Sequence, residues 1–169
     1  MKTQRKLFYT LLFLNMLFTF NFGCVSVNLG SRKVDRATGV KYKAPDKPFY
    51  SESSPSADAL WISQKTGNAI SYMSECDENS NQDLKLIAQD SLGSILNMTV
   101  FEQKETLYND RKAYEITAEG EIDGILMQIH VIVFRKNSCT YHLSYVGRKK
   151  IWNSEHEYYQ NFLTSFRAR

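Results

Sequence analysis

The region between Thr99 and Val146 alternates apolar and polar residues in long runs that are separated by short turn-forming pairs. Such alternation puts every second side chain on the same face of a strand, and it predicts antiparallel strands joined by tight turns. Asp123-Gly124 is a strong signal for a two-residue turn, and Asn109-Asp110 is a second turn pair. Because tight turns join neighbouring antiparallel strands, this region is restricted to a four-strand meander.

The two turn pairs also predict the register of the meander. They place Ile116 opposite Val131 and Ala118 opposite Ile129. All four side chains are apolar, which indicates one consistently inward face. A slip of one residue would send every one of them to the other face of the sheet.

The last hairpin of the meander needs a loop of odd length to keep this alternation. A three-residue loop at 135–137 pairs Phe134 with Ser138. In that register His130 lies opposite His142 on the outward face. The inward residues of the final strand are then Cys139, Tyr141, Leu143 and Tyr145.

A hairpin and two helices complete the predicted fold. Residues 59–63 and 69–76 flank the turn-rich sequence QKTGN, so they predict a hairpin. Residues 80–96 carry apolar residues at helical spacing after Ser80, and a second helix is predicted from Ser154, where SEHE matches a capping box. The fold class is α+β: an antiparallel sheet, made of an N-terminal hairpin and the meander, packed with two helices.

The amino-acid composition restricts the class of protein to which this chain can belong. With 169 residues and 43% hydrophobic residues, the chain is large and apolar enough for one packed domain, which excludes a disordered chain. Residues 49–146 contain seven basic and fourteen acidic residues, so nucleic acid is not an expected partner.

The amino terminus has the pattern of an export signal. The basic sequence MKTQRK precedes an apolar run at 7–20, and Gly23-Cys24 resembles the end of a bacterial lipobox. That resemblance implies a lipoprotein signal peptide at 1–23 and an acylated Cys24 that anchors the chain in a membrane. An uncleaved anchor and ordinary soluble secretion are the two alternatives.

Further expectations concern location and the linking segment. The residue after the cysteine, Val25, is not the Asp that in enteric bacteria keeps lipoproteins at the inner membrane, so the resemblance implies the outer membrane, facing the periplasm. Residues 24–57 contain Gly and Pro without periodicity and predict a flexible tether before a single domain at 58–169. Basic residues in this tether either rest on anionic lipid headgroups or are simply solvated.

The order of elements resembles a known architecture. A hairpin, a helix, a four-strand meander and a closing helix that ends NFLTSF are similar to the α/β/α sandwich of the photosystem II protein PsbP and its relatives, over residues 49–169. The resemblance implies a non-catalytic role in binding or assembly, without a cofactor.

Two further cysteines are candidates for a disulfide. Cys76 and Cys139 are predicted to point inward from their strands, and in an exported chain whose Cys24 is acylated they are the only possible intramolecular pair. The alternative is two separate buried thiols.

The outward face of the predicted sheet contains a candidate metal site. His130, His142 and Glu115 come together there in the predicted register, and two imidazoles with a carboxylate can hold zinc. The alternative is a polar sheet face whose histidines bond to neighbours or water.

These observations favour a membrane-anchored periplasmic lipoprotein that binds an envelope protein or a small ligand without catalysis. One alternative is a metal-dependent or hydrolytic enzyme that uses the outward His/Glu cluster. Another is a lipid carrier in which the sandwich opens into an apolar cavity.

Overall fold

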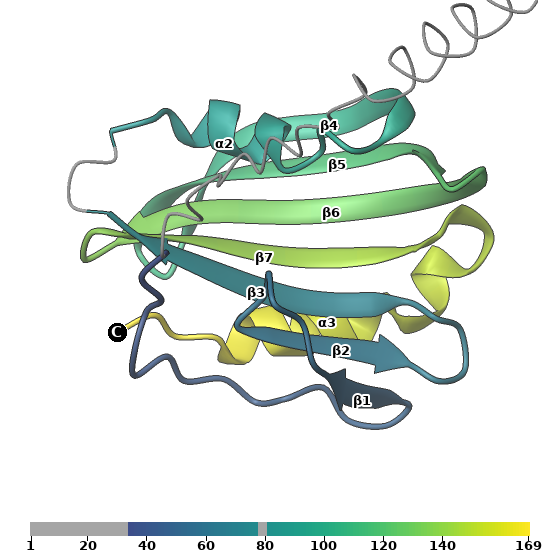
Figure 1. Ribbon diagram of the computed structural model, residues 1–169, viewed down its shortest axis with the longest axis horizontal. Coiled ribbons are helices and arrows are strands. Elements are labelled where there is room, and N and C mark those ends of the chain that lie inside the picture. Colours follow the sequence, from purple (N-terminus) through teal and green to yellow (C-terminus); the bar gives the residue numbers. More distant parts are fainter. Residues whose placement is uncertain (1–33, 78–80) are drawn as a thin grey trace, which may run out of the picture. The chain divides into compact units, whose positions relative to one another are not determined.

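One antiparallel sheet organises residues 34–77 and 81–169, the part of the chain that the computed structural model describes. Its seven strands lie in the order β1-β2-β3-β7-β6-β5-β4 (Figure 1). Their bounds are β1 Phe49–Glu52, β2 Ala59–Ser63, β3 Ala69–Cys76, β4 Leu96–Tyr108, β5 Arg111–Ile122, β6 Ile125–Lys136 and β7 Cys139–Arg148. The predicted fold class is confirmed.

Helices cover both faces of the sheet. On one face lies α2, Leu84–Asp90, and on the other lie the 3-10 turn η1, Lys149–Glu155, and α3, His156–Ser165 (Figure 1). The central strand β6 is therefore buried continuously over residues 129–134. Alternation alone assigned inward residues to one face of the meander; the second face is buried as well because α3 covers it, as expected for an α/β/α sandwich.

Each face has its own hydrophobic core. The core beneath α3 is largely aromatic, and its members include Trp61, Phe134, Tyr141, Tyr145, Tyr159, Phe162 and Phe166. The smaller core beneath α2 is mainly aliphatic and is made of Ala88, Leu92, Tyr114, Ile116, Ala118, Ile129, Val131 and Val133.

The first two turns of the meander lie where they were predicted. Tyr108 pairs with Arg111 across the first turn, and Ile122 pairs with Ile125 across the second. The register of β5 with β6 follows, including Ile116 opposite Val131.

The last hairpin differs from its prediction. Its turn has two residues, Asn137 and Ser138, with φ values of 50° and 60°, so that Lys136 pairs with Cys139. Positive φ at both turn positions matches the right-handed twist of the flanking strands, and asparagine tolerates it well. The side-chain amide of Asn137 also donates to the backbone oxygen of Arg169 at 2.9 Å, which holds the turn against the chain end.

Both helices are shorter than predicted. Asp83 caps α2 by accepting a hydrogen bond from the Lys85 amide at 2.9 Å. The helix ends at Asp90, and β4 already begins at Leu96, the last residue of the predicted helix. The predicted cap, Ser80, lies outside the described residues. At the closing helix, the Ser154 hydroxyl bonds to the Ile151 carbonyl oxygen instead of capping, and α3 begins at His156.

The folded part begins earlier than the predicted boundary at residue 58. Asp35 forms a bridge with Cys76, Lys41 forms one with Arg167, and β1 pairs with β2, so residues from Val34 onward belong to the folded unit. This segment follows an irregular path along the sheet, which explains why it has no strand or helix periodicity. The predicted signal peptide at 1–23 and the first part of the tether lie outside the described residues.

Candidate functional site

The short helix α2 leaves part of its face of the sheet uncovered. Ala88 of α2 and Leu92, just after the helix, pack in the core over β5 and β6, while β3 and β7 extend beyond α2. A groove of about 330 Å³ lies on this uncovered part. We call it the α2-side groove; its lining is Ser56, Ala57, Ser71, Met73, Ser91, Ser94, Ile95, Ile122, Ile129, Val131, His142, Ser144 and Val146.

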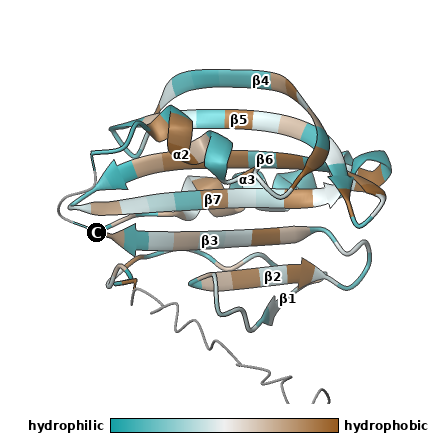
Figure 2. Ribbon diagram, turned by 45° about the horizontal axis from the view of Figure 1, so that its top comes forward, coloured by the Kyte–Doolittle hydropathy of each residue, from teal (hydrophilic) through white to brown (hydrophobic). Residues whose placement is uncertain are grey.

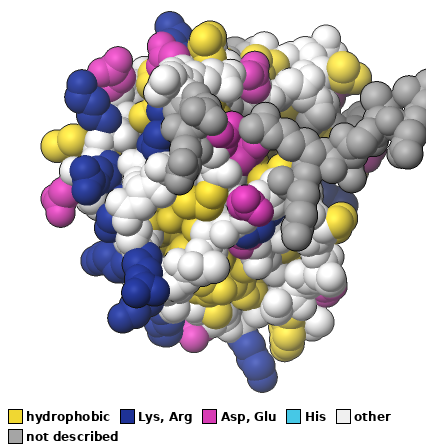
Figure 3. Space-filling view, turned by 60° about the vertical axis from the view of Figure 1, so that its left-hand side comes forward, with side chains coloured by type: hydrophobic (Ala, Val, Ile, Leu, Met, Phe, Trp, Pro, Cys, Tyr) yellow, Lys and Arg dark blue, Asp and Glu magenta, His cyan; other side chains and the backbone are white. Residues whose placement is uncertain are grey.

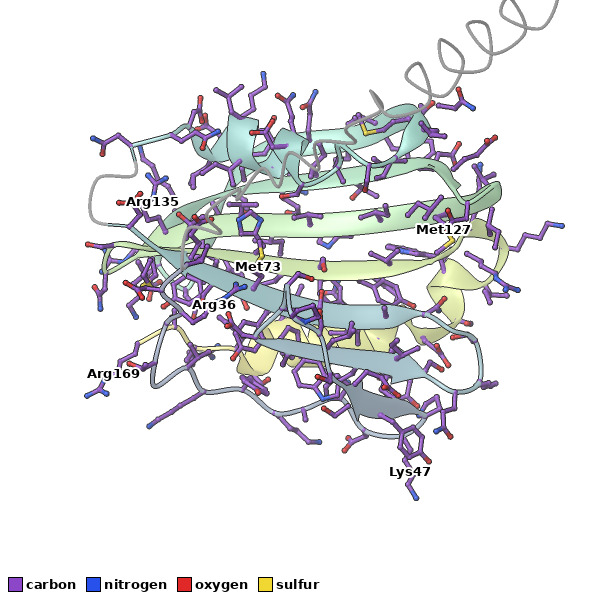
Figure 4. All side chains as sticks on the ribbon, in the orientation of Figure 1. Arg36, Lys47, Met73, Met127, Arg135 and Arg169 are labelled. Carbon is purple, nitrogen blue, oxygen red and sulfur yellow. A yellow bond between two sulfur atoms is a disulfide. The ribbon has the colours of Figure 1, made fainter. Side chains whose placement is uncertain are left out.

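The groove combines an apolar floor with hydroxyl groups. Ile129, Val131 and Val146 come from the central strands, and Met73, labelled in Figure 4, comes from β3. Five serines line the same space, and two of them bond to each other across β3 and β7. Within the described residues no Asp, Glu, Lys or Arg lines the groove. The site can therefore take a ligand that is mainly apolar and carries uncharged polar groups.

His142 is the titratable group of the groove. Burial lowers its pKa to about 4, so the imidazole is neutral at pH 7. Its Nδ1 lies 3.0 Å from Ser91 Oγ, and the Ser91 hydroxyl donates to the Ile87 carbonyl oxygen at 2.9 Å. Since that hydroxyl has one proton, Nδ1 must be the donor toward Ser91. The pair holds α2 on the sheet, and the histidine is not placed as a base that takes the serine proton.

The three predicted metal ligands do not come together. The two-residue turn at 137–138 pairs His130 with Tyr145 and Val133 with His142, so the two histidines lie on opposite faces of the sheet. The predicted His130–His142 pairing is thus wrong, and one ion cannot bind both. Among residues 34–77 and 81–169, no group of three His, Cys, Asp or Glu side chains is arranged to hold a metal.

His130 and Glu115 do meet, beneath α3. His130 is 5% exposed, and its Nε2 lies 2.8 Å from Glu115 Oε1. The pKa of Glu115 is lowered, first by this hydrogen bond and then by the charges of His130 and Lys104, against the opposing effect of burial. The arrangement pairs a buried histidine with a partly exposed glutamate beneath α3.

The predicted disulfide is present. Cys76 and Cys139 lie directly opposite each other on β3 and β7, with their Cα atoms 3.9 Å apart, and their sulfurs are bonded. The bond joins strands whose pairing is distant in the sequence. The third cysteine, Cys24, lies outside the described residues.

A buried polar network around Glu155 was not predicted from the sequence. Glu155 is 3% exposed and accepts hydrogen bonds from Ser63 at 2.8 Å, from Thr66 and from Asn68. Asn68 also donates to the Tyr145 hydroxyl at 2.9 Å. This network ties η1 to the β2–β3 turn. Its carboxylate lies within SEHE, which was interpreted only as a capping pattern, and no sequence signal marks its burial.

Comparison with known proteins identifies the fold. No known protein family and no curated protein matches the sequence. The solution structure of cyanobacterial PsbP (CyanoP) from Synechocystis sp. PCC 6803 is similar, with a TM-score of 0.55 and 8% identity over 83% of this chain and 99% of that one. The chain has a PsbP-like fold.

Two further solved structures share this PsbP-like fold. LpqN, described as involved in cell envelope biogenesis of Mycobacterium tuberculosis, has a TM-score of 0.58 and 9% identity over 81% of this chain and 86% of LpqN. PA94 of Pseudomonas aeruginosa, a protein of unknown function, has a TM-score of 0.52 and 8% identity over 82% and 88%. At these identities the likeness establishes the fold alone.

Proposed function

We propose that this PsbP-like protein is a membrane-anchored envelope module that binds a small uncharged amphiphile in the α2-side groove, without converting it chemically. The observation that carries the proposal is the apolar floor with serine hydroxyls on the part of the sheet that α2 leaves open. The groove volume of about 330 Å³ is at the lower end of the range for small-molecule sites.

The lining specifies the chemical class of the ligand. A charged head group inside the groove would lose its hydration without gaining an ionic partner, because His142 is neutral and the described lining contains no acid or base that is charged at pH 7. Serine hydroxyls can instead bond to an alcohol, ester or amide. A single acyl or isoprenoid chain with such a head group fits these requirements. The proposed function therefore includes the lipid carrier that was an alternative in the sequence analysis.

A ligand-binding test uses the uncharged fluorescent probe N-phenyl-1-naphthylamine. Ser94 lines the groove and is exposed, so Ser94→Trp obstructs the groove without disturbing the core. We expect this variant to bind the probe at least about tenfold more weakly than the wild type, which corresponds to about 1.4 kcal/mol.

The matched control is Ser51→Trp, an exposed serine of the edge strand β1 that is not part of the groove lining. It should bind the probe as the wild type does. Equal probe binding by Ser94→Trp and Ser51→Trp would rule out the groove as the binding site.

The anchor is supported by the lipobox-like sequence ending at Cys24 and by the folded body, which begins at Val34 and leaves a short connecting segment. Val25 after the cysteine supports the outer membrane, with the protein facing the periplasm. Within the described residues no helix is long and apolar enough to cross a membrane.

The intact mass of the protein purified from membranes tests the anchor. We expect a chain that begins at Cys24 and carries the added mass of a diacylglyceryl group and a further acyl chain such as palmitate. A mass that retains residues 1–23 without added lipid would contradict the lipoprotein and favour the uncleaved anchor.

A further inference from the structure

Exposed apolar side chains gather at the end of the sheet that carries the β5–β6 turn. Ile125 and Leu126, directly after this turn, are 43% and 44% exposed. The adjoining start of β4 adds Leu96, Met98 and Phe101, which are also exposed. Figure 2 shows this part of β4 as hydrophobic, whereas the middle of the strand is hydrophilic. Such a gathering on the surface of a soluble body marks a site of interaction.

Three consecutive cations adjoin these apolar residues. Arg148, Lys149 and Lys150 lie where β7 passes into η1, and they line a cleft of about 900 Å³ together with Gly124, Ile125, Leu126 and Ile151. No acid is among these lining residues. We call this surface the basic-apolar cleft.

Two of the three cations have no side-chain partner within residues 34–77 and 81–169. Lys149 pairs with Glu119 at 2.5 Å and lies 5.9 Å from the centre of the Phe101 ring. The side chains of Arg148 and Lys150 make no hydrogen bond or ion pair with another described residue. As far as the described part of the chain shows, both can bind an external anion; one acid, Asp123, lies in the neighbouring turn.

Two arginines toward the opposite end of the sheet have a structural role instead. Figure 3 shows Lys and Arg side chains gathered along one side of that end, and Figure 4 labels Arg36 and Arg135 there. Arg36 pairs with Asp58 at 3.7 Å and donates to the Ser74 carbonyl oxygen, while Arg135 donates to the Gln82 carbonyl oxygen at 2.9 Å. These side chains hold irregular segments onto the sheet, so charge alone does not mark a binding surface here.

We propose that the basic-apolar cleft docks on an anionic phospholipid membrane. Ile125 and Leu126, at the tip of a tight hairpin, enter the boundary between head groups and acyl chains, and Arg148 and Lys150 bind lipid phosphates beside them. The adjacency of an apolar tip and free cations matches the layering of an anionic bilayer surface, in which phosphates lie directly above hydrocarbon. The proposal concerns a second membrane contact and rests neither on the groove ligand nor on the anchor at Cys24.

The test uses the full chain carrying Leu126→Trp, mixed with vesicles of brominated lipid. Bromine quenches tryptophan fluorescence only at close range, and the native Trp61 and Trp152 are both buried. We expect strong quenching with phosphatidylglycerol in the vesicles and weak quenching with phosphatidylcholine alone. Adding Arg148→Glu and Lys150→Glu should lower the ratio of docked to undocked protein by roughly tenfold or more.

Two controls decide the outcome. Arg111→Glu with Lys112→Glu reverses another exposed consecutive basic pair, at the opposite end of β5, and should leave the quenching unchanged. Leu107→Trp, at a 75% exposed position near that opposite end, should be quenched less than Leu126→Trp. Equal quenching in both lipids, or no effect of reversing Arg148 and Lys150, would overturn the proposal. So would binding of polyglutamate without any response to vesicles, which would assign the cleft to an acidic protein.

Discussion

Replacing both Cys76 and Cys139 by alanine is expected to lower the free energy of unfolding by about 4 kcal/mol, because the loop-entropy relation gives that value for a closed loop spanning a sequence separation of 63. Residues 77–138, which include α2 and most of the meander, lie within this loop. Without the bond, the unfolded chain regains the conformational entropy that the closed loop removes. Forming the β3–β7 pairing then costs the entropy of closing that loop.

Urea unfolding of the wild type and of the double variant, each with and without reductant, measures this effect. The wild type should lose the same free energy on reduction as it loses by the double substitution. The double variant should be insensitive to reductant, which also excludes an effect through Cys24. If reductant leaves the stability of the wild type unchanged, the disulfide does not stabilise the folded state.

Acidification from about pH 6.5 to about pH 4 is expected to destabilise the protein by an amount on the order of 3 kcal/mol through His142 alone. Burial lowers the pKa of His142 from 6.5 to about 4 in the folded state. Above pH 6.5 the imidazole is neutral in both states and its contribution to stability is complete. As the pH falls through this window, the unfolded state binds the proton first, and the equilibrium shifts toward unfolding.

The variant His142→Gln isolates this contribution. Its stability should depend much less on pH between 6.5 and 4.5 than that of the wild type. His156→Gln is the matched control. Burial and then the charge of His130 lower the pKa of His156 as well, but the pKa of His142 is lowered more, so His156→Gln should reduce the pH dependence less than His142→Gln does. Glu115 affects the pH dependence of stability mainly below this window. Its pKa is lowered from 4.5 in the folded state, so its stabilising effect is present above pH 4.5 and is lost as the pH falls through its folded-state pKa. A wild-type slope that persists in His142→Gln would contradict the assignment.

The α2-side groove and the basic-apolar cleft differ in what they accept. The groove is lined by serines and a neutral histidine, whereas the cleft has three cations beside aliphatic side chains. An uncharged amphiphile fits the first surface and an anionic bilayer fits the second. A module that takes such a ligand from a membrane, or delivers it to one, would use both surfaces, and the two experiments test them separately.

Local sequence determined the elements whose signals are carried by adjacent residues. The pairs Asn109-Asp110 and Asp123-Gly124 adopt positive φ and form the two-residue turns that were predicted from them. A short hairpin turn sets the register of its strands directly, so the pairing of β5 with β6, and that of β4 with β5 from Glu102 to Tyr108, needed no knowledge of the rest of the fold. Two register shifts between Leu96 and Glu102 interrupt the predicted β4–β5 pairing in the first part of β4. The Cys76–Cys139 disulfide was predicted because these are the only two cysteines left to pair in an exported chain whose Cys24 is acylated, and the bond is present.

Tertiary structure alone decided which surfaces are exposed, and with them the candidate sites. In the last hairpin, the sequence favoured a three-residue loop, whereas the turn has two residues, and β6 is apolar enough to be buried on both faces. Only the packing of α3 on one face and of α2 on the other distinguishes the two registers, because a shift of one residue moves a whole strand's side chains across the sheet. That shift separates His142 from His130 and removes the predicted metal site. It also places His142 in the α2-side groove, whose opening depends on how little of the sheet a seven-residue helix can cover.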